Sequence, residues 1–230
     1  MAKTNWYSIK NAANNTGEVY LYDEIGGGWG NGTTSDQFAK DLAAMGDVKT
    51  INVYINSPGG SVFEGLSIYN LLTRHKAKVD VSIDGVAASI ASVIAMAGDT
   101  INIAENASMM IHNPWSLVIG DAATMRKEAD LLDRVGTQLV TTYAARTKAT
   151  EDKIRAYMDA ETWFSATEAK SLGFADSITA AKRMAASFDL SRFRNAPRHE
   201  PAPEPPKPLN FAEQIANINH FLATRREYRR

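Results

Sequence analysis

Asp84-Gly85-Val86-Ala87-Ala88-Ser89-Ile90-Ala91-Ser92 joins a predicted strand to a predicted helix. Residues 79–83, before this run, alternate in the manner of a β-strand, and the apolar residues from Ser89 to Ala97 are typical of a buried helix. Small side chains at such a junction let a second stretch of backbone, or a substrate, approach closely. Ser89 therefore lies where a strand gives way to a helix, with little bulk around its hydroxyl.

Strand-like and helix-like segments alternate on both sides of this junction. We expect strands over 18–22, 50–55 and 100–103, and helices over 62–72 and, capped by Thr34-Ser35-Asp36-Gln37, up to Met45. Repeated strand–helix–strand units predict an α/β fold with a parallel sheet and crossover helices. A longer helix is expected over 121–146. Its broad apolar stripe predicts burial against another surface, such as a second subunit, and includes Met125, Ala129, Leu132, Leu139 and Tyr143.

A serine hydroxyl needs a neighbouring base to act as a nucleophile at neutral pH, and imidazole is the usual one. His112 lies in Met109-Met110-Ile111-His112-Asn113-Pro114, after a predicted strand. The first 190 residues hold one other histidine, His75, in the charged stretch Thr73-Arg74-His75-Lys76. If Ser89 has a base in the folded part of the chain, His112 is the candidate.

A glycine pair follows the strand expected over 50–55, in Asn56-Ser57-Pro58-Gly59-Gly60-Ser61. Paired glycines allow backbone conformations in which N–H groups point at a carbonyl oxygen or an oxyanion. Taken singly, these features are more often an ordinary turn, a helix-packing serine and a structural histidine. Together they supply the oxyanion donors, the nucleophile and the base of a hydrolytic site.

Composition limits the other classes of function. The chain has 230 residues, 44% of them hydrophobic, so we expect one domain plus an appendage. It has no cysteine, which excludes disulfides, thiolate metal sites and a cysteine nucleophile. The net charge of −1 gives no general attraction to nucleic acid, and the longest apolar run, 86–98, is too short to span a bilayer. The N-terminus does not resemble a signal peptide, so we expect a cytoplasmic protein.

The composition changes near residue 190. Six of the eight prolines lie between Pro197 and Pro208, and no glycine follows Gly173. We expect a folded domain over 1–190, a proline-rich linker over 191–209 and a basic tail over 210–230. The tail is either a disordered solubilising segment or a short docking helix with apolar positions at Phe211, Ile215, Ile218 and Leu222.

In order and spacing, these motifs resemble the ClpP family of serine peptidases over about residues 15–180. The resemblance rests on Tyr54-Ile55-Asn56-Ser57-Pro58-Gly59-Gly60-Ser61, Gly65-Leu66-Ser67-Ile68-Tyr69, Gly85-Val86-Ala87-Ala88-Ser89 and Met110-Ile111-His112-Asn113-Pro114. It implies a ClpP/crotonase-like fold of repeated ββα units, ring-shaped homo-oligomers with 121–146 at the ring-to-ring contact, and no metal or organic cofactor. It also implies Ser89 as the nucleophile, His112 as the general base, and the Gly60 and Ile90 amides as the oxyanion hole.

The resemblance leaves the third member of the triad open. The family has an aspartate just before a segment that resembles Trp163-Phe164-Ser165-Ala166-Thr167-Glu168-Ala169. Matching that segment places Glu161 at the position, with Asp159 two residues away. A glutamate can orient imidazole as an aspartate does, and we favour Glu161 over Asp159.

Within the family, the chain is most similar to the ClpP-related head maturation proteases of tailed phages. Trp6-Tyr7-Ser8-Ile9-Lys10, the run from Glu18 to Gly26, Asn113-Pro114-Trp115 and the proline-rich extension carry this likeness. It implies an endopeptidase that processes capsid or scaffold proteins in the host cytoplasm or the prohead. The alternative is a general proteolytic subunit working with a separate ATPase, since the sequence has no ATP-binding motif.

Three further interpretations are open. A crotonase-like acyl-CoA enzyme has the same fold but needs no serine–histidine pair. A Ser–Lys signal-peptide peptidase would have a membrane anchor and a lysine in place of His112. A non-catalytic capsid-assembly component would carry no activated serine.

Overall fold

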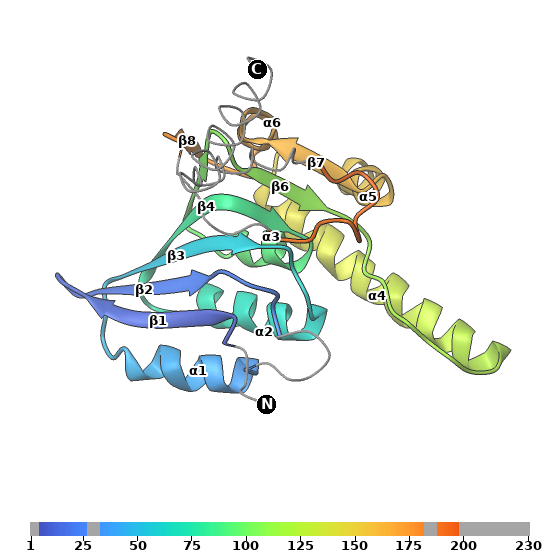
Figure 1. Cartoon of the computed structure of the whole chain (residues 1–230), viewed down its shortest axis with the longest axis horizontal. Helices are drawn as coiled ribbons and strands as arrows, with labels where there is room; N and C mark the ends of the chain where they lie inside the picture. The colour runs from blue at the N-terminus through green and yellow to red at the C-terminus, as the bar shows by residue number, and fades with distance from the viewer. Residues whose placement is uncertain (1–4, 27–32, 182–187, 198–230) are drawn as a thin grey trace, which may run out of the picture. The chain divides into compact units, whose positions relative to one another are not determined.

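The computed structural model describes residues 5–26, 33–181 and 188–197 (Figure 1). They are organised around an eight-stranded sheet whose main path runs β1-β2-β3-β4-β5-β8, with β6 branching from β4 and β7 pairing with β6. The strands are β1 (Tyr7–Ala12), β2 (Thr16–Leu21), β3 (Thr50–Ser57), β4 (Lys78–Ala88), β5 (Thr100–Ala104), β6 (Ser108–Ile111), β7 (Thr162–Ser165) and β8 (Ser177–Thr179).

Most of the sheet is parallel, as the alternation of strands and helices predicts. The pairs β2–β3, β3–β4, β4–β5, β4–β6 and β5–β8 are parallel, whereas β1 and β7 are antiparallel to β2 and β6. The α/β fold expected from the sequence is confirmed. The strand β1 escaped prediction because its last residues are exposed, so its composition gives no apolar alternation.

One strand, β4, positions the candidate site by pairing with two strands in succession. Its first half pairs with β5, from Asp80↔Thr100 to Ile83↔Ile103, and its end pairs with β6, from Val86↔Ser108 to Ala88↔Met110. The sequence predicts a strand only over 79–83, because the small residues that follow show no alternation. Those residues extend the strand to Ala88 since β3 and β6 hold them from either side.

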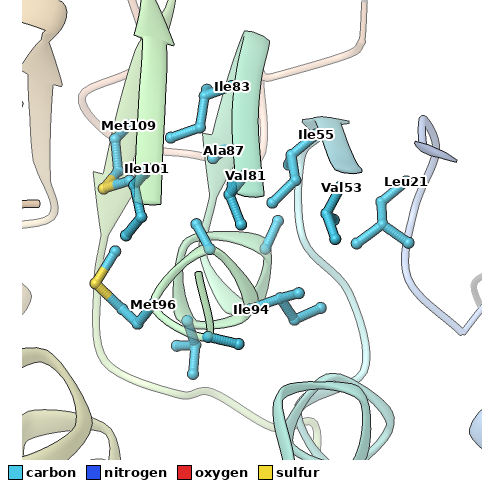
Figure 2. Close-up of a cluster of buried hydrophobic side chains, with 14 of the residues drawn as sticks. Leu21, Val53, Ile55, Val81, Ile83, Ala87, Ile94, Met96, Ile101 and Met109 are labelled. Atoms are coloured by element: carbon cyan, nitrogen blue, oxygen red, sulfur yellow. The ribbon is translucent and has the colours of Figure 1, made fainter. Parts of the chain in front are cut away.

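Helices α1 (Ser35–Ala44), α2 (Val62–Thr73) and α3 (Ile90–Ala95) follow the predicted segments closely. The expected cap of α1 is present, since Thr34 accepts the Gln37 N–H. Every residue of α3 is buried. Figure 2 shows why: Val53, Ile55 and Val81 point from the sheet toward the helix that carries Ile94.

Asp121 caps the long helix α4 (Ala122–Arg146) by accepting the Thr124 N–H. The helix extends beyond the sheet (Figure 1). Among the described residues, its second half is the packed one: Leu139 and Tyr143 are buried, whereas Met125 is 49% exposed. The single apolar stripe expected from the sequence therefore divides into a packed half and an exposed half.

The chain then forms α5 (Glu151–Asp159), β7, α6 (Ala166–Leu172) and β8. A capping box between Ser165 and Glu168 starts α6, and Gly173 ends it in a left-handed conformation. The described residues beyond β8 are 180–181 and 188–197, and Phe193 in the second stretch is 6% exposed. Packed structure thus continues into the segment that the composition assigns to the linker.

The basic tail predicted over 210–230, with its alternative of a short docking helix, lies outside the described residues, as do residues 198–209 of the predicted linker. In the described ranges, no helix combines the length and apolar composition that crossing a membrane requires.

Candidate active site

Ser89 occupies a strained turn between β4 and α3. It has φ 55° and ψ −131° as the N-cap of α3, a conformation that residues other than glycine rarely adopt. Its N–H donates to the Met110 carbonyl at 2.9 Å, which fixes the turn against β6. Such strain costs about 1–3 kcal/mol and persists where the surrounding structure imposes it, most often at functional sites.

The pairing of β4 with β6 brings His112 to Ser89. Ala88 and Met110 are the last residues paired, so Ser89 and His112 lie just beyond the ends of neighbouring parallel strands. Nε2 of His112 is 2.8 Å from Oγ of Ser89, although the two residues are 23 apart in the sequence. This is the distance at which an imidazole can take a serine proton.

The glycine pair forms a loop against the Ser89 turn. Ile25 anchors it: the Ile25 N–H donates to the Gly59 carbonyl (2.8 Å), and the Ser61 N–H donates to the Ile25 carbonyl (2.9 Å). Within the described ranges, no hydrogen bond uses the Gly60 N–H. Ile90 is the first residue of α3, so its N–H has no carbonyl within the helix to bind. Both predicted oxyanion donors are therefore available to a ligand.

Close approach explains why both positions are glycine. A Cβ on Gly59 would lie 2.6 Å from the Cβ of Ser89, and a Cβ on Gly60 would lie 2.1 Å from the Ile25 carbonyl oxygen. Their φ angles, 91° and 148°, also disfavour any side chain. The sequence shows only a flexible turn here; the structure shows a loop pressed onto the serine.

Glu161 and Asp159 occupy different places relative to the imidazole. The antiparallel pairing of β6 with β7 ends at Ile111↔Thr162, so Glu161 lies opposite His112 one step beyond it. Asp159 instead accepts a hydrogen bond from Nδ2 of Asn113 (2.8 Å). In the described part of the chain, no hydrogen bond joins Glu161 to the His112 ring: its Oε1 accepts the Asn195 N–H (2.6 Å).

The surroundings of His112 favour its neutral form. Burial lowers the pKa of His112 below its ordinary value; the Glu161 carboxylate opposes this shift, and the Arg192 cation adds to it. A cavity of about 410 Å³ adjoins the ring, lined by His112, Asp159, Glu161, Arg192 and Arg194 among others. A neutral imidazole can accept the proton of Ser89.

Ser92 and Tyr143 form a buried support for the serine turn that sequence reasoning missed. The Ser92 hydroxyl donates to the Ser89 carbonyl (2.6 Å) and lies 3.0 Å from the Met110 carbonyl. A hydroxyl has one proton, so the Tyr143 hydroxyl, 2.8 Å away, donates to Ser92. The sequence contains one signal for this pair: Tyr143 lies on the apolar stripe of α4, and a buried tyrosine hydroxyl usually has a partner. The pair ties α4 to the nucleophile turn.

The other histidine of the folded part, and possible metal ligands, do not add to this site in the described residues. His75 lies past the end of α2, and its Nδ1 accepts the Ala77 N–H. Within the described ranges, no group of three or more histidine, aspartate and glutamate side chains is arranged to hold a metal ion. The functional groups brought together are the serine, the imidazole, the amides and the carboxylate.

Comparison with known proteins agrees with this geometry. The family model for Clp protease matches residues 1–182. An ATP-dependent Clp protease proteolytic subunit of Pleurastrum terricola is 35% identical over 143 residues, which cover 61% of this chain and 73% of that protein. The subunit of the same name from Bacteroides fragilis is 35% identical over 136 residues, which cover 58% of this chain and 66% of that protein.

A third relative, the ATP-dependent Clp protease proteolytic subunit 3 of Rhodococcus jostii, is 34% identical over 161 residues, covering 68% of this chain and 76% of that protein. This chain therefore covers roughly two thirds to three quarters of the length of these three relatives. Together with the match of the family model to residues 1–182, these similarities show that the protein belongs to the Clp protease family of serine peptidases.

Proposed function

We propose that this chain is a serine endopeptidase in which Ser89 attacks the peptide carbonyl and His112 is the general base. The observation that carries the proposal is the 2.8 Å contact between His112 Nε2 and Ser89 Oγ at a strained turn. The unused Gly60 and Ile90 amides beside that turn supply donors for an oxyanion.

The reaction proceeds in two halves. Ser89 Oγ bonds to the carbonyl carbon while its proton passes to His112 Nε2, and the carbonyl oxygen becomes an oxyanion held by the Gly60 and Ile90 N–H groups. The C–N bond then breaks, with His112 protonating the leaving amine, and an acyl-enzyme remains. Water, deprotonated by His112, attacks the ester and restores Ser89. The lowered pKa of His112 keeps the ring neutral, as the first step requires.

We assign Glu161, rather than Asp159, as the carboxylate that stabilises the imidazolium. Glu161→Gln is expected to lower kcat/KM about 10- to 100-fold, less than the roughly 10⁴-fold loss caused by removing a hydrogen-bonded triad acid. The reason is that Glu161 acts on His112 through its charge, while its Oε1 binds Asn195. Peptide hydrolysis under single-turnover conditions measures the effect.

Asp159→Asn is the matched control, because its new side-chain oxygen still accepts from Asn113. Its kcat/KM should stay within about twofold of wild type, as expected for a carboxylate that does not act on the imidazole. A larger loss for Asp159→Asn than for Glu161→Gln would reverse the assignment.

We propose that the protein forms ring-shaped homo-oligomers, and that the exposed half of α4 and the loop before it make the contact between two rings. Four large apolar side chains are exposed there in the described part of the chain: Trp115 (67%), Leu117 (70%), Ile119 (91%) and Met125 (49%). Exposed apolar patches of this kind are typical of interaction sites. The family resemblance supports a second copy as the occupant.

The double variant Ile119→Glu/Met125→Glu is expected to shift the assembly toward a species of about half the mass, because it buries charge at the contact. Multi-angle light scattering over a dilution series measures the mass. Ile178→Glu is the control: it makes the same kind of change at a residue 37% exposed on β8 and should leave the mass unchanged. A wild-type protein that is monomeric at every concentration would contradict the proposal.

The partner we propose is a separate ATPase that unfolds substrates. The relatives are named ATP-dependent proteolytic subunits, and this sequence has no ATP-binding motif. Processing of phage capsid or scaffold proteins stays a prediction, carried by the likeness of residues such as Asn113-Pro114-Trp115 and by the extension beyond the family match. Neighbouring portal and major capsid genes would favour head maturation; their absence would favour general proteolysis.

A further inference from the structure

The segment from Phe188 to Ala196 packs against the candidate site, although it lies beyond the part of the chain that the family model matches. In Figure 1 it is the orange-red stretch that passes β6 and β7. Its side chains contact the oxyanion loop, the imidazole and the turn that carries Glu161. One short segment thus touches all three functional parts of the site.

Arg192 binds the oxyanion loop and its anchor. Its Nη2 donates to the Pro58 carbonyl (3.1 Å), immediately before the glycine pair. Its Nη1 forms an ion pair with Glu24 (2.6 Å), the neighbour of the Ile25 residue that bridges to the loop. The planar guanidinium therefore joins two loop segments, one at Glu24 and one at Pro58. The spacing of these segments sets the direction of the Gly60 N–H.

Asn195 holds the carboxylate and the turn beneath it. Its N–H donates to Glu161 Oε1 (2.6 Å), and its Nδ2 donates to the Ala160 carbonyl (2.7 Å) and lies 3.2 Å from the Glu161 carbonyl. Glu161 has φ 48°, a conformation that needs such support. These bonds fix both the backbone and the side chain of the proposed triad acid.

Phe193 is the hydrophobic anchor that seats the two polar residues. Its ring meets the His112 ring edge to face at 5.6 Å and the Trp163 ring at 5.7 Å. It is 6% exposed and packs with Val86, Ala88 and Met110 from β4 and β6. Burial of this ring fixes the segment's position, and it also shields one side of the imidazole from water.

We propose that Arg192 and Asn195 are positioning residues of the peptidase site, supplied by a segment outside the family-matched region. The inference rests on the proposed function. The segment frames the site rather than filling it as a bound substrate would. None of its described hydrogen bonds goes to Ser89 Oγ or to the Gly60 and Ile90 amides.

The test measures kcat/KM against pH for full-length variants. Arg192→Ala is expected to lower the maximum about 10- to 100-fold, the size of effect that a small displacement of catalytic groups produces. It should also move the acid limb to higher pH, because the Arg192 cation lowers the pKa of His112 and its loss lets that pKa rise. The other charged groups facing His112 across the cavity, Asp159, Glu161 and Arg194, are unchanged.

Companion variants separate positioning from folding. Arg192→Lys keeps the charge but not the planar fork, so its acid limb should stay at the wild-type pH while its maximum recovers in part. Asn195→Ala removes the two Nδ2 bonds to the Ala160 and Glu161 carbonyls and keeps the backbone N–H bond to Glu161 Oε1. It should lower kcat with little change in KM, since it loosens the turn that carries Glu161 and not the substrate. Arg146→Ala removes an arginine from an ion pair of the same length (2.6 Å, to Asp176) and should keep wild-type activity.

Three outcomes are decisive. Unchanged kcat/KM and pH profile for Arg192→Ala and Asn195→Ala would overturn the positioning role alone. Increased activity in either variant would overturn it in favour of a segment that blocks the cleft. Failure of a fluorophosphonate probe to label Ser89 in the wild-type protein would overturn the proposed peptidase function, and the positioning role with it.

Discussion

Ser89→Ala is expected to reduce kcat for peptide hydrolysis about 10⁵- to 10⁶-fold, the loss seen when a triad serine is removed. No other described hydroxyl lies within hydrogen-bond distance of His112, so nothing can replace Ser89 Oγ as the attacking atom. Folding should be unaffected, because the Ser89 backbone bond to Met110 and the Ser92 bond to the Ser89 carbonyl do not use the lost hydroxyl.

Ser82→Ala is the matched control for this variant. Ser82 lies on the same strand, β4, in the portion that pairs with β3 and β5, away from the turn. It should keep wild-type hydrolysis of a fluorogenic peptide and of casein. Hydrolysis by Ser89→Ala at a tenth or more of the wild-type rate would contradict the account, since about 10³- to 10⁴-fold catalysis over water is all that the remaining site should give.

Gly60→Ala is expected to have the second-largest effect, a drop in kcat of about 10²- to 10³-fold from loss of one oxyanion donor. Its Cβ would lie 2.1 Å from the Ile25 carbonyl oxygen and 2.8 Å from the Ile25 nitrogen, so the bridge that anchors the loop must open. Displacement of the loop moves the Gly60 N–H away from the oxyanion. Steady-state kinetics with a peptide substrate, paired with thermal unfolding, measures both consequences.

Gly46→Ala separates the lost donor from simple backbone strain. Gly46 also has positive φ (70°), but nothing lies within 4 Å of its added Cβ, and it follows the end of α1. It should lower the unfolding temperature through strain of about 1–3 kcal/mol while kcat stays at the wild-type value. Equal losses of kcat in the two variants would mean that the Gly60 amide has no special role.

Local signals in the sequence were enough to predict the elements that lead to the site. The cap at Thr34, the apolar run after Ser89 and the alternation in β3 each reflect short-range physics, and each element was found close to its predicted place. Ser89 and His112 were paired because few histidines compete. That argument needs no coordinates, and the 2.8 Å contact agrees with it.

Features that depend on register could not be predicted in this way. The match to a family segment favours Glu161 over Asp159, but it does not give the position of either carboxylate relative to the imidazole. The β6–β7 pairing, which ends at Ile111↔Thr162, adds that Glu161 lies opposite His112. The bond between Asn113 and Asp159, like the bond between Asn195 and Glu161, joins residues more than thirty positions apart that only the folded sheet brings together.

Composition placed the start of the linker too early, and it left open what covers the apolar stripe of α4. Proline content placed residues from 191 onward in a linker, but Phe193 is buried against β4 and β6, because one aromatic ring is enough to seat a short segment. The apolar stripe of α4 predicted burial against another surface, such as a second subunit, and Met125 is half exposed in the single chain. A stripe shows that a helix has a partner surface, and it does not say whether that surface belongs to the same chain.

The central claim is that His112 activates Ser89 as a nucleophile. It is tested most directly by treating the wild-type protein with a fluorophosphonate and mapping the adduct by mass spectrometry, with His112→Ala in parallel. The account predicts one adduct, on Ser89, and a labelling rate in His112→Ala that is lower by at least about 10³-fold, as expected when a nucleophile loses its base. An unlabelled Ser89, or equal labelling with and without the imidazole, would contradict it.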